Sequence, residues 1–247
     1  MDVAREVPTL VTARRKEGGE VLVVLPHDEA SNPDSAETGR VDPVEVKRYY
    51  IDEERYDWVS DPKYPEKLFH RWRERAIVNR VRALRPAGRV LDLGAGTGLL
   101  SRHLEGALVV SLDINRWALL RAARHVGTGV ALVEGDAEQL PLASEVFDFV
   151  LCTDVLEHLV GVEQSLSEIA RVLKPEGILA GEVPSRHIVW RYRTRITTTC
   201  PVAEPFHNNF EAPELRQLLS RFFRVEEIKP VVFGLEWFFV VRKCASR

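Results

Sequence analysis

The sequence predicts an α/β fold, a doubly wound and mostly parallel sheet with helices on both faces. From residue 89 onward, strand-like apolar runs alternate with helical patterns, as in parallel strands joined by crossover helices. Three glycines within five positions (94, 96 and 98) follow the first of these strands. Such a glycine-rich turn indicates a ligand pressed against the main chain, because glycine permits close backbone approach.

The individual elements follow from the apolar periodicity and the turn residues. A helix is expected over 66–85, closed by Pro86. Near the carboxyl end, a helix at 213–220 is followed by the strand-like runs "FFRVEEI" and "GLEWFFVV" with no helix between them, which predicts a closing antiparallel hairpin. The remaining strands are expected at 89–93, 108–113, 129–134, 147–152 and 177–183, and the remaining helices near 97–105, 115–126 and 162–173.

The amino-terminal residues are predicted to form an extension, residues 1–45, before a single domain over 46–247. Residues 9–25 contain two short strand-like runs around "EGGE", which favours a hairpin. Residues 26–43 carry almost no large apolar side chain and are expected to be a mobile linker.

Composition excludes several classes of protein. The net charge of −3 gives no global field for nucleic acid, and no apolar run approaches the roughly 20 residues of a membrane span. The amino terminus lacks the apolar core of a signal peptide, and the three cysteines are scattered. These features predict a cytoplasmic protein without a membrane span and without a metal site, although the adjacent Glu157 and His158 leave a divalent ion open.

The glycine motif "LDLGAGTG" favours a nucleotide-like ligand. The strand is expected to end at Leu93 and a helix to begin near Thr97, so that free N–H groups and a positive dipole end face the ligand. The dinucleotide fingerprint would place its third glycine at position 99, which is Leu99. The spacing G-x-G-x-G therefore argues against a nicotinamide-dependent oxidoreductase.

Two carboxylates follow the next strands. Asp113 ends the second strand of the series, where a carboxylate can accept hydrogen bonds from a ribose diol, and it can also cap the helix that begins near Asn115. Asp136 ends the third strand, where an adenine amine can donate to it.

The ordered motifs "VLDLGAGTG", "SLDIN", "GDAEQLPL", "FDFVLCTDVLEHL" and "RVLKPEGILAGEVP" resemble the class I S-adenosylmethionine-dependent methyltransferases, in particular the small-molecule type that includes ubiquinone and menaquinone methyltransferases. The resemblance covers about residues 86–185. It implies a Rossmann-like seven-stranded sheet with an antiparallel last strand, and S-adenosyl-L-methionine as cofactor.

The resemblance also implies roles for individual residues. Asp92 and the glycine loop would hold the methionine portion of the cofactor, and Asp113 would bind the ribose. Ile114, Asp136 and Ala137 would surround the adenine, and Cys152 and Thr153 would lie near the sulfonium. The implied cofactor-binding residues are Asp92, Gly94, Ala95, Gly96, Gly98, Asp113, Ile114, Asp136, Ala137, Cys152 and Thr153.

Two histidines are candidate bases for the acceptor's proton. His158 follows the fourth strand of the series, on the cofactor-facing edge; the alternative is a packing histidine paired with Glu157. His207 lies in "EPFHNNF", where substrate contacts are common in the resembled family; the alternative is a plain loop histidine.

The stretch "SRHIVWRYRTR" carries arginines without a nearby acid. Arg191, Arg193 and Arg195 are candidate substrate-binding residues, since guanidinium groups bind carboxylate and phosphate in a two-pronged way. The alternative is solvated surface. Trp190 and Tyr192 among them also suit an aromatic acceptor or a nucleobase.

These features together predict methyl transfer to a small acceptor, anionic or aromatic, by in-line displacement. Two alternatives stay open: a methyltransferase that acts on RNA or protein, and a non-catalytic methyltransferase-like partner subunit. The sequence predicts no oligomeric state.

Overall fold

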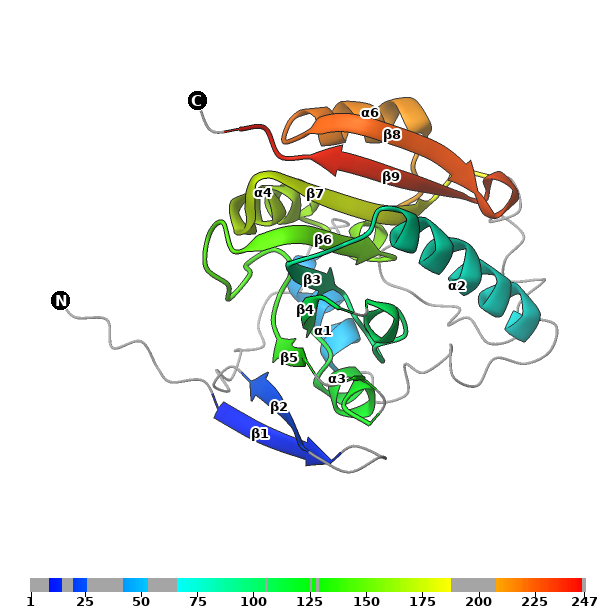
Figure 1. The fold of residues 1–247 in the computed structure, drawn as a ribbon. Coiled ribbons are helices and arrows are strands. Elements are labelled where there is room, and N and C mark those ends of the chain that lie inside the picture. The colour runs from blue at the N-terminus through cyan, green and yellow to red at the C-terminus, as the bar shows by residue number, and fades with distance from the viewer. Residues whose placement is uncertain are drawn as a thin grey trace.

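A computed structural model describes residues 9–14, 20–25, 42–52, 66–104, 106–124, 126–127, 129–187 and 208–245. Its centre is a nine-stranded sheet in the order β1-β2-β5-β4-β3-β6-β7-β9-β8 (Figure 1). The strands are β1 (Thr9–Arg14), β2 (Glu20–Leu25), β3 (Arg89–Leu93), β4 (Leu108–Asp113), β5 (Val130–Glu134), β6 (Phe147–Thr153), β7 (Leu173–Pro184), β8 (Arg224–Val231) and β9 (Glu236–Arg242).

Seven of these strands, from β5 to β8 in the sheet order, form the predicted seven-stranded sheet. β3 pairs parallel with β4 and β6, and β9 lies antiparallel between β7 and β8. The predicted fold class, with an antiparallel last strand, is therefore confirmed. The other two strands are an addition: β1 pairs antiparallel with β2, and β2 joins the edge of the sheet parallel to β5.

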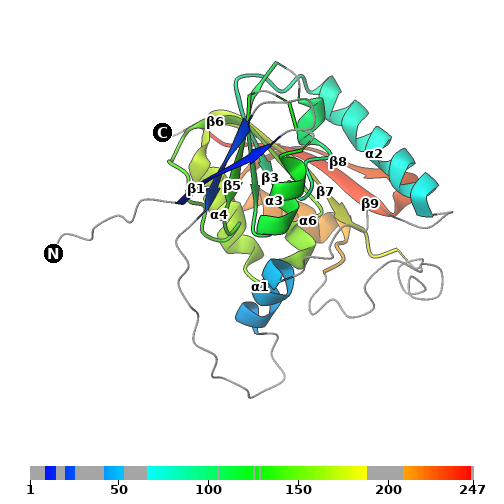
Figure 2. The same ribbon diagram turned by 90° about the horizontal axis from the view of Figure 1, so that it is seen from below.

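Helices cover both faces of the sheet (Figure 2). α4 (Val162–Val172) and α6 (Ala212–Ser220) pack on one face, and α2 (Glu66–Ala83) packs on the other. An apolar core lies on each face of the sheet, and alternate residues of one strand pack into the two cores. Val150 and Cys152 of β6 face α4, whereas Phe149 and Leu151 face α2. This alternation is the two-residue period of a strand that is buried on both sides.

The expected helix over 97–105 is wrong. The structure has only a 3₁₀ turn there, Ser101–His103, and α3 (Arg116–Ala122) is the next α-helix. Gly96 and Gly98 adopt φ angles of 51° and 76°, in the left-handed region, so the chain cannot start a right-handed helix across them. The loop is held instead by β4, because the N–H groups of Gly94 and Ala95 both donate to the carbonyl of Leu112.

One further helix, α1 (Pro43–Asp52), precedes the sheet region in sequence and straddles the predicted boundary between extension and domain. It is tied to the start of α3, since the side-chain amide of Asn115 donates to the carbonyl of Tyr50 at 2.8 Å. The domain boundary itself stays a prediction, and the expected mobile linker lies mostly outside the described residues. No described helix is long and apolar enough to cross a membrane.

Candidate functional site

A cavity of about 250 Å³ lies at the carboxyl ends of β3, β4, β5 and β6. The glycine loop forms its floor, and helices α1 and α2 contribute the residues that cover it. In an α/β sheet, the carboxyl ends of neighbouring parallel strands are where ligands bind. Its lining includes Lys47 and Tyr50 of α1, Arg73 and Ile77 of α2, and the loop residues Gly94, Ala95, Gly96 and Thr97.

Asp113 braces the glycine loop from the end of β4. Its two carboxylate oxygens accept from the N–H of Gly96 at 2.7 Å and from the N–H of Asn115 at 2.8 Å. Burial raises the pKa of Asp113, and these backbone donors lower it in part. The helix cap is Asn115 itself, whose side chain accepts from the N–H of Ala118 at 2.9 Å. Asp113 thus holds the loop and does not cap α3.

Asp92, at the end of β3, is 2% exposed. Its carboxylate accepts from the hydroxyl of Ser101, which lies 2.7 Å from the hydroxyl of Ser111. Burial raises the pKa of Asp92 to about 7; the Ser101 hydrogen bond opposes this shift and the nearby charge of Asp113 adds to it. A buried carboxylate with a single side-chain donor is suited to receive a cation.

Asp136 and Glu138 form an acidic pair after β5. The ammonium of Lys47 lies 2.7 Å from a carboxylate oxygen of each. Asp136 also accepts from the N–H of Glu138, and Glu138 accepts from the N–H of Gly161, both at 2.8 Å. Helix α1 is therefore held at this end of the cavity by one lysine.

The structure brings most of the predicted site residues together, but Gly98 and Cys152 do not line the cavity. A Cβ at Gly98 would meet Val126 and Ala122, so that glycine allows close packing with the α3 region. Cys152 is fully buried in the core, and burial raises the pKa of its thiol. The predicted residues that do line the cavity are Asp92, Gly94, Ala95, Gly96, Asp113, Ile114, Asp136, Ala137, Thr153 and His158. His207, Arg191, Arg193 and Arg195 lie outside the described residues.

His158 lines the cavity from the 3₁₀ turn η2 (Leu156–His158). Its side chain is 14% exposed to solvent. The hydroxyl of Tyr50 is 2.7 Å from Nδ1, and a carboxylate oxygen of Glu157 is 3.9 Å from Nε2. His158 therefore borders the cavity and also neighbours Glu157, and its role as a base stays a prediction.

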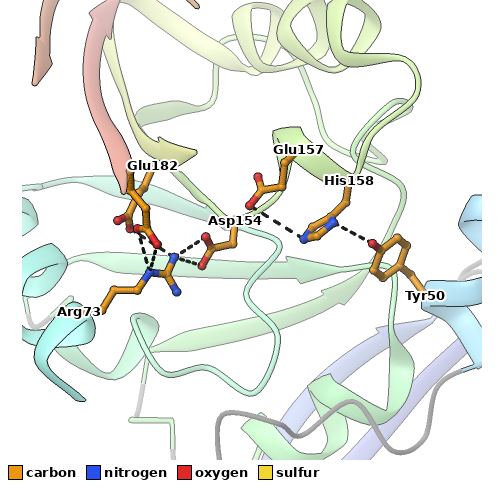
Figure 3. Close-up of polar contacts among 7 residues, drawn as sticks. Tyr50, Arg73, Asp154, Glu157, His158 and Glu182 are labelled. Carbon is orange, nitrogen blue, oxygen red and sulfur yellow. Dashed lines mark hydrogen bonds and ion pairs between the residues drawn. The ribbon is translucent and has the colours of Figure 1, made fainter. Parts of the chain in front are cut away.

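A cluster of carboxylates surrounds Arg73 beside His158 (Figure 3). The guanidinium forms ion pairs with Asp154, with Glu236 at 2.8 Å and with Glu182 at 3.5 Å. Burial tends to lower the pKa of Arg73, but the charges of Asp154 and Glu236 raise it overall. Arg73 is therefore the fixed positive centre of this cluster.

The carboxylates of the cluster differ in their protonation. Burial tends to raise the pKa of Asp154, yet the charge of Arg73 outweighs it and lowers the pKa overall. Burial raises the pKa of Glu236 to about 7, and burial with the charge of Asp154 raises that of Glu157 well above its usual range. Asp154 is therefore charged at neutral pH, whereas Glu157 binds its proton more tightly than an ordinary carboxyl does. In the part of the chain that the structure describes, no group of three or more His, Cys, Asp or Glu side chains is arranged to hold a metal ion.

Sequence reasoning missed Tyr50, Lys47, Arg73, Glu182 and Glu236. Two of them had a visible signal: Glu182 in "ILAGEVP" and Glu236 in "GLEWFFVV" are lone acids inside apolar strands. A buried strand tolerates a lone acid only when another element supplies its partner. Nothing in the sequence indicates that this partner is Arg73, 109 positions before Glu182 and 163 before Glu236.

Comparison with known proteins identifies the family of the domain that contains this site. A family model for the methyltransferase domain matches residues 91–181, the segment from β3 to β7 that carries the glycine loop and the cavity acids. The chain carries a class I S-adenosylmethionine-dependent methyltransferase domain. The predicted family resemblance is thus confirmed.

Two curated relatives illustrate the similarity of this methyltransferase domain. The ubiquinone biosynthesis O-methyltransferase of Parvibaculum lavamentivorans is 32% identical over 168 residues, 61% of this chain and 65% of that protein. The malonyl-[acyl-carrier protein] O-methyltransferase of Methylococcus capsulatus is 41% identical over 105 residues, 38% of this chain and 37% of that protein. The chain thus spans less than two thirds of either relative.

The fold has a counterpart among solved structures. The magnesium protoporphyrin IX methyltransferase of Synechocystis, solved with bound S-adenosylhomocysteine, superposes with a TM-score of 0.64. The superposition covers 82% of this chain and 100% of that one, at 20% sequence identity. At this identity, the similarity concerns the fold alone.

The cavity of the methyltransferase domain fits S-adenosylmethionine by its chemistry. The cofactor presents an ammonium, a ribose diol and an adenine amine, all hydrogen-bond donors, and it carries a positive sulfonium. The cavity lines up the carboxylates of Asp92, Asp113 and Asp136 along the strand ends. These acceptors match the hydrogen-bond donors of the cofactor, and their negative charge suits its ammonium and its sulfonium.

Proposed function

We propose that this protein transfers the methyl group of S-adenosylmethionine to a small-molecule acceptor by in-line displacement. The observation that carries the proposal is the cavity, whose lining combines three strand-end carboxylates with Tyr50, Asp154 and His158. The first group suits the cofactor, and the second group offers polar atoms to an acceptor. The curated relatives named above support methyl transfer to oxygen of small or carrier-bound molecules.

In this proposal, Asp92 receives the ammonium of the cofactor, Asp113 the ribose hydroxyls and Asp136 the adenine amine. Ile114 and Ala137 would pack against the adenine, and Gly94, Ala95 and Gly96 would bring the main chain close to the methionine portion. Thr153 would lie near the sulfonium. Gly98 and Cys152 would act only indirectly, since neither lines the cavity.

The bound cofactor supplies a methyl group that is already activated by the adjacent sulfonium. The protein therefore has to orient the acceptor, exclude water and, for an O–H or N–H acceptor, receive a proton. The apolar side chains of Ile77, Leu99 and Leu159 line the cavity and would exclude water from it. His158 is the candidate base in the described part of the chain.

Two features of the protein favour different charges on the acceptor. Arg191, Arg193 and Arg195 favour an anionic acceptor, but they lie outside the described residues. The described lining beside His158 is acidic. Asp154 borders the cavity there, and Glu182 and Glu236 lie behind it around a single arginine. The anionic acceptor stays a prediction that the arginine variants below test, and a neutral aromatic acceptor is compatible with both features.

The decisive experiment supplies methyl-labelled S-adenosylmethionine together with separate pools of small metabolites, RNA and protein. We expect the small-metabolite pool to acquire the label. Label in RNA or protein would support a macromolecular acceptor instead. Binding of S-adenosylhomocysteine without label in any pool would support a non-catalytic partner subunit.

A further inference from the structure

We propose that Tyr50 of helix α1 is the group that first meets the acceptor's proton, and that His158 is the base behind it. This inference rests on the proposed function and applies to acceptors that are methylated on oxygen or nitrogen. It assigns a catalytic residue to the amino-terminal part of the chain, upstream of the segment that matches the methyltransferase domain.

The geometry of the His158 ring leads to this assignment. Nδ1 lies 2.7 Å from the hydroxyl of Tyr50, and Nε2 faces Glu157 at 3.9 Å. Both residues border the cavity, and the hydroxyl of Tyr50 occupies Nδ1, so an acceptor that donates to this hydroxyl is linked through it to the ring. The rings of Tyr50 and His158 also pack at a centroid distance of 5.1 Å, which fixes their mutual orientation.

The direction of the hydrogen bond follows from the two groups. An imidazole nitrogen is a much stronger base than a phenol oxygen, so the hydroxyl of Tyr50 donates and Nδ1 accepts. The proton of the neutral ring is then on Nε2, on the side of Glu157. A phenol oxygen that donates its proton still accepts through its lone pairs, so an acceptor O–H or N–H can donate to Tyr50.

The proposed proton transfer balances with the methyl transfer. The acceptor oxygen or nitrogen forms a bond to the methyl carbon while the carbon–sulfur bond of the cofactor breaks and its electron pair stays on sulfur. The acceptor's proton moves to the oxygen of Tyr50 as the proton of Tyr50 moves to Nδ1. The positive charge that leaves the sulfur therefore ends on the imidazolium of His158.

The surroundings of His158 stabilise that imidazolium. Asp154, after β6, is charged because of its ion pair with Arg73 of α2, and its charge interacts favourably with a charged His158. Burial and the charge of Asp154 raise the pKa of Glu157, whose carboxyl group lies 3.9 Å from Nε2 as a polar neighbour. Among the described residues, the charged and titratable groups that face the ring include Tyr50 from α1, Glu157 from its own turn, and Asp154 backed by Arg73.

Two substitutions test the relay by the rate of label incorporation into the small-metabolite pool. Tyr50→Phe removes only the hydroxyl, and we expect kcat to fall by about 100-fold or more, the usual size of general-base catalysis. His158→Gln should cause a similar loss, and the double variant should be little worse than either single one, because the two groups act as one unit. The affinity for S-adenosylhomocysteine should change less than about twofold in all three.

Tyr49→Phe is the matched control. Tyr49 neighbours Tyr50 on α1 at a ring distance of 5.1 Å and does not line the cavity. We expect its kcat to stay within about twofold of the unsubstituted protein.

A second readout needs no acceptor. The nitrogen chemical shifts of His158, measured by NMR on the full chain with S-adenosylhomocysteine, report which ring nitrogen carries the proton. We expect the proton on Nε2 in the unsubstituted protein, and a changed proton distribution in Tyr50→Phe but not in Tyr49→Phe.

The outcomes separate this inference from the proposed function. If the protein transfers label but Tyr50→Phe keeps its kcat while His158→Gln loses it, His158 acts directly and the relay is wrong. A proton on Nδ1 in the unsubstituted protein also overturns the relay, whether or not an acceptor is found. Absence of label in every pool overturns the proposed function, whereas the NMR result still decides the geometry of the ring.

Discussion

The ammonium of Lys47 lies 2.7 Å from the carboxylate of Asp136, and both residues line the cavity. The same ammonium meets Glu138, so one lysine ties α1 to the end of β5. Tyr50, about one turn further along α1, contacts His158. One face of α1 thus contacts both the segment after β5 and the turn after β6.

Lys47→Met should weaken cofactor binding by about 3- to 10-fold, which corresponds to about 0.7–1.4 kcal/mol. The reason is that α1 loses its attachment to Asp136 and Glu138, so that bound cofactor escapes faster. Calorimetry with S-adenosylhomocysteine measures the affinity. Arg48→Met is the matched control, since Arg48 is exposed on the same helix and the charge change is identical. Equal effects of both substitutions would mean that only net charge matters.

Asp113→Asn should raise the dissociation constant of S-adenosylhomocysteine by about 10- to 150-fold, the range for a lost hydrogen bond to a charged group. The substitution removes the charge that would accept from the ribose, while an amide oxygen can still hold the N–H of Gly96. The melting temperature should therefore fall only slightly. A large loss of stability with unchanged affinity would show that Asp113 serves the loop alone.

Asp92→Asn should stabilise the protein at pH 8. The pKa of Asp92 is about 7 in the fold, against 3.8 for an unperturbed carboxyl. The folded state therefore binds the proton more tightly, and stability is lost as pH rises from about 4 to about 7. Asparagine does not titrate, so the variant should gain at pH 8, by at most about 4 kcal/mol, and the gain should shrink towards pH 4.

Asp148→Asn should change stability in the opposite direction to Asp92→Asn. Lys174, 2.6 Å away, lowers the pKa of Asp148, so this carboxylate contributes stability that is present at neutral pH and is lost in acid. Its asparagine variant should be less stable at pH 8, and urea unfolding at several pH values compares the two. Parallel pH dependence in both variants would contradict the assigned protonation of Asp92.

Arg73→Met should destabilise the fold by about 3–5 kcal/mol at pH 8, because it leaves the carboxylates around it buried without a counter-charge. Their pKa values then rise, so protons bind in the folded state and part of the stability returns as pH falls to about 5.5. Urea unfolding at both pH values measures this recovery. Arg75→Met is the control, since Arg75 is exposed on the same helix. A loss that does not depend on pH would point to lost packing instead.

Single alanine variants of Arg191, Arg193 and Arg195 test the charge of the acceptor. If the acceptor is anionic, at least one of them should raise its KM by about 10- to 150-fold and leave cofactor affinity unchanged. Solvated arginines would each change binding by less than about 0.5 kcal/mol. Unchanged KM in all three would favour a neutral acceptor against the acidic wall formed by Asp154.

The predicted elements and the observed ones agree where the signal was periodic. The strand predicted over 89–93 has these bounds in the structure, and the helix predicted over 162–173 ends one residue earlier. The helix expected over 97–105 failed because it was expected to begin near Thr97 and to include Gly98, whereas Gly96 and Gly98 both adopt left-handed angles. Periodicity reports burial, and it does not report the sign of φ at a glycine.

The sequence also predicted some residues of the candidate site and not others. Asp92, Asp113 and Asp136 were found because each follows a strand, and the ends of neighbouring parallel strands meet at one edge. Cys152 does not line the cavity, because its side chain alternates with that of Thr153 and packs in the core on the α4 side of the sheet.

By itself, the sequence determined the sheet, the cavity at its strand ends and the family of the domain, because these depend on residues that are close along the chain or repeat with a fixed period. The tertiary structure alone decided what covers that cavity. Tyr50 meets His158 over 108 positions, and Arg73 meets Asp154 over 81 positions. Such contacts depend on how α1 and α2 dock onto the sheet, and helix docking is set by the shape and charge of the whole surface, which no local pattern records.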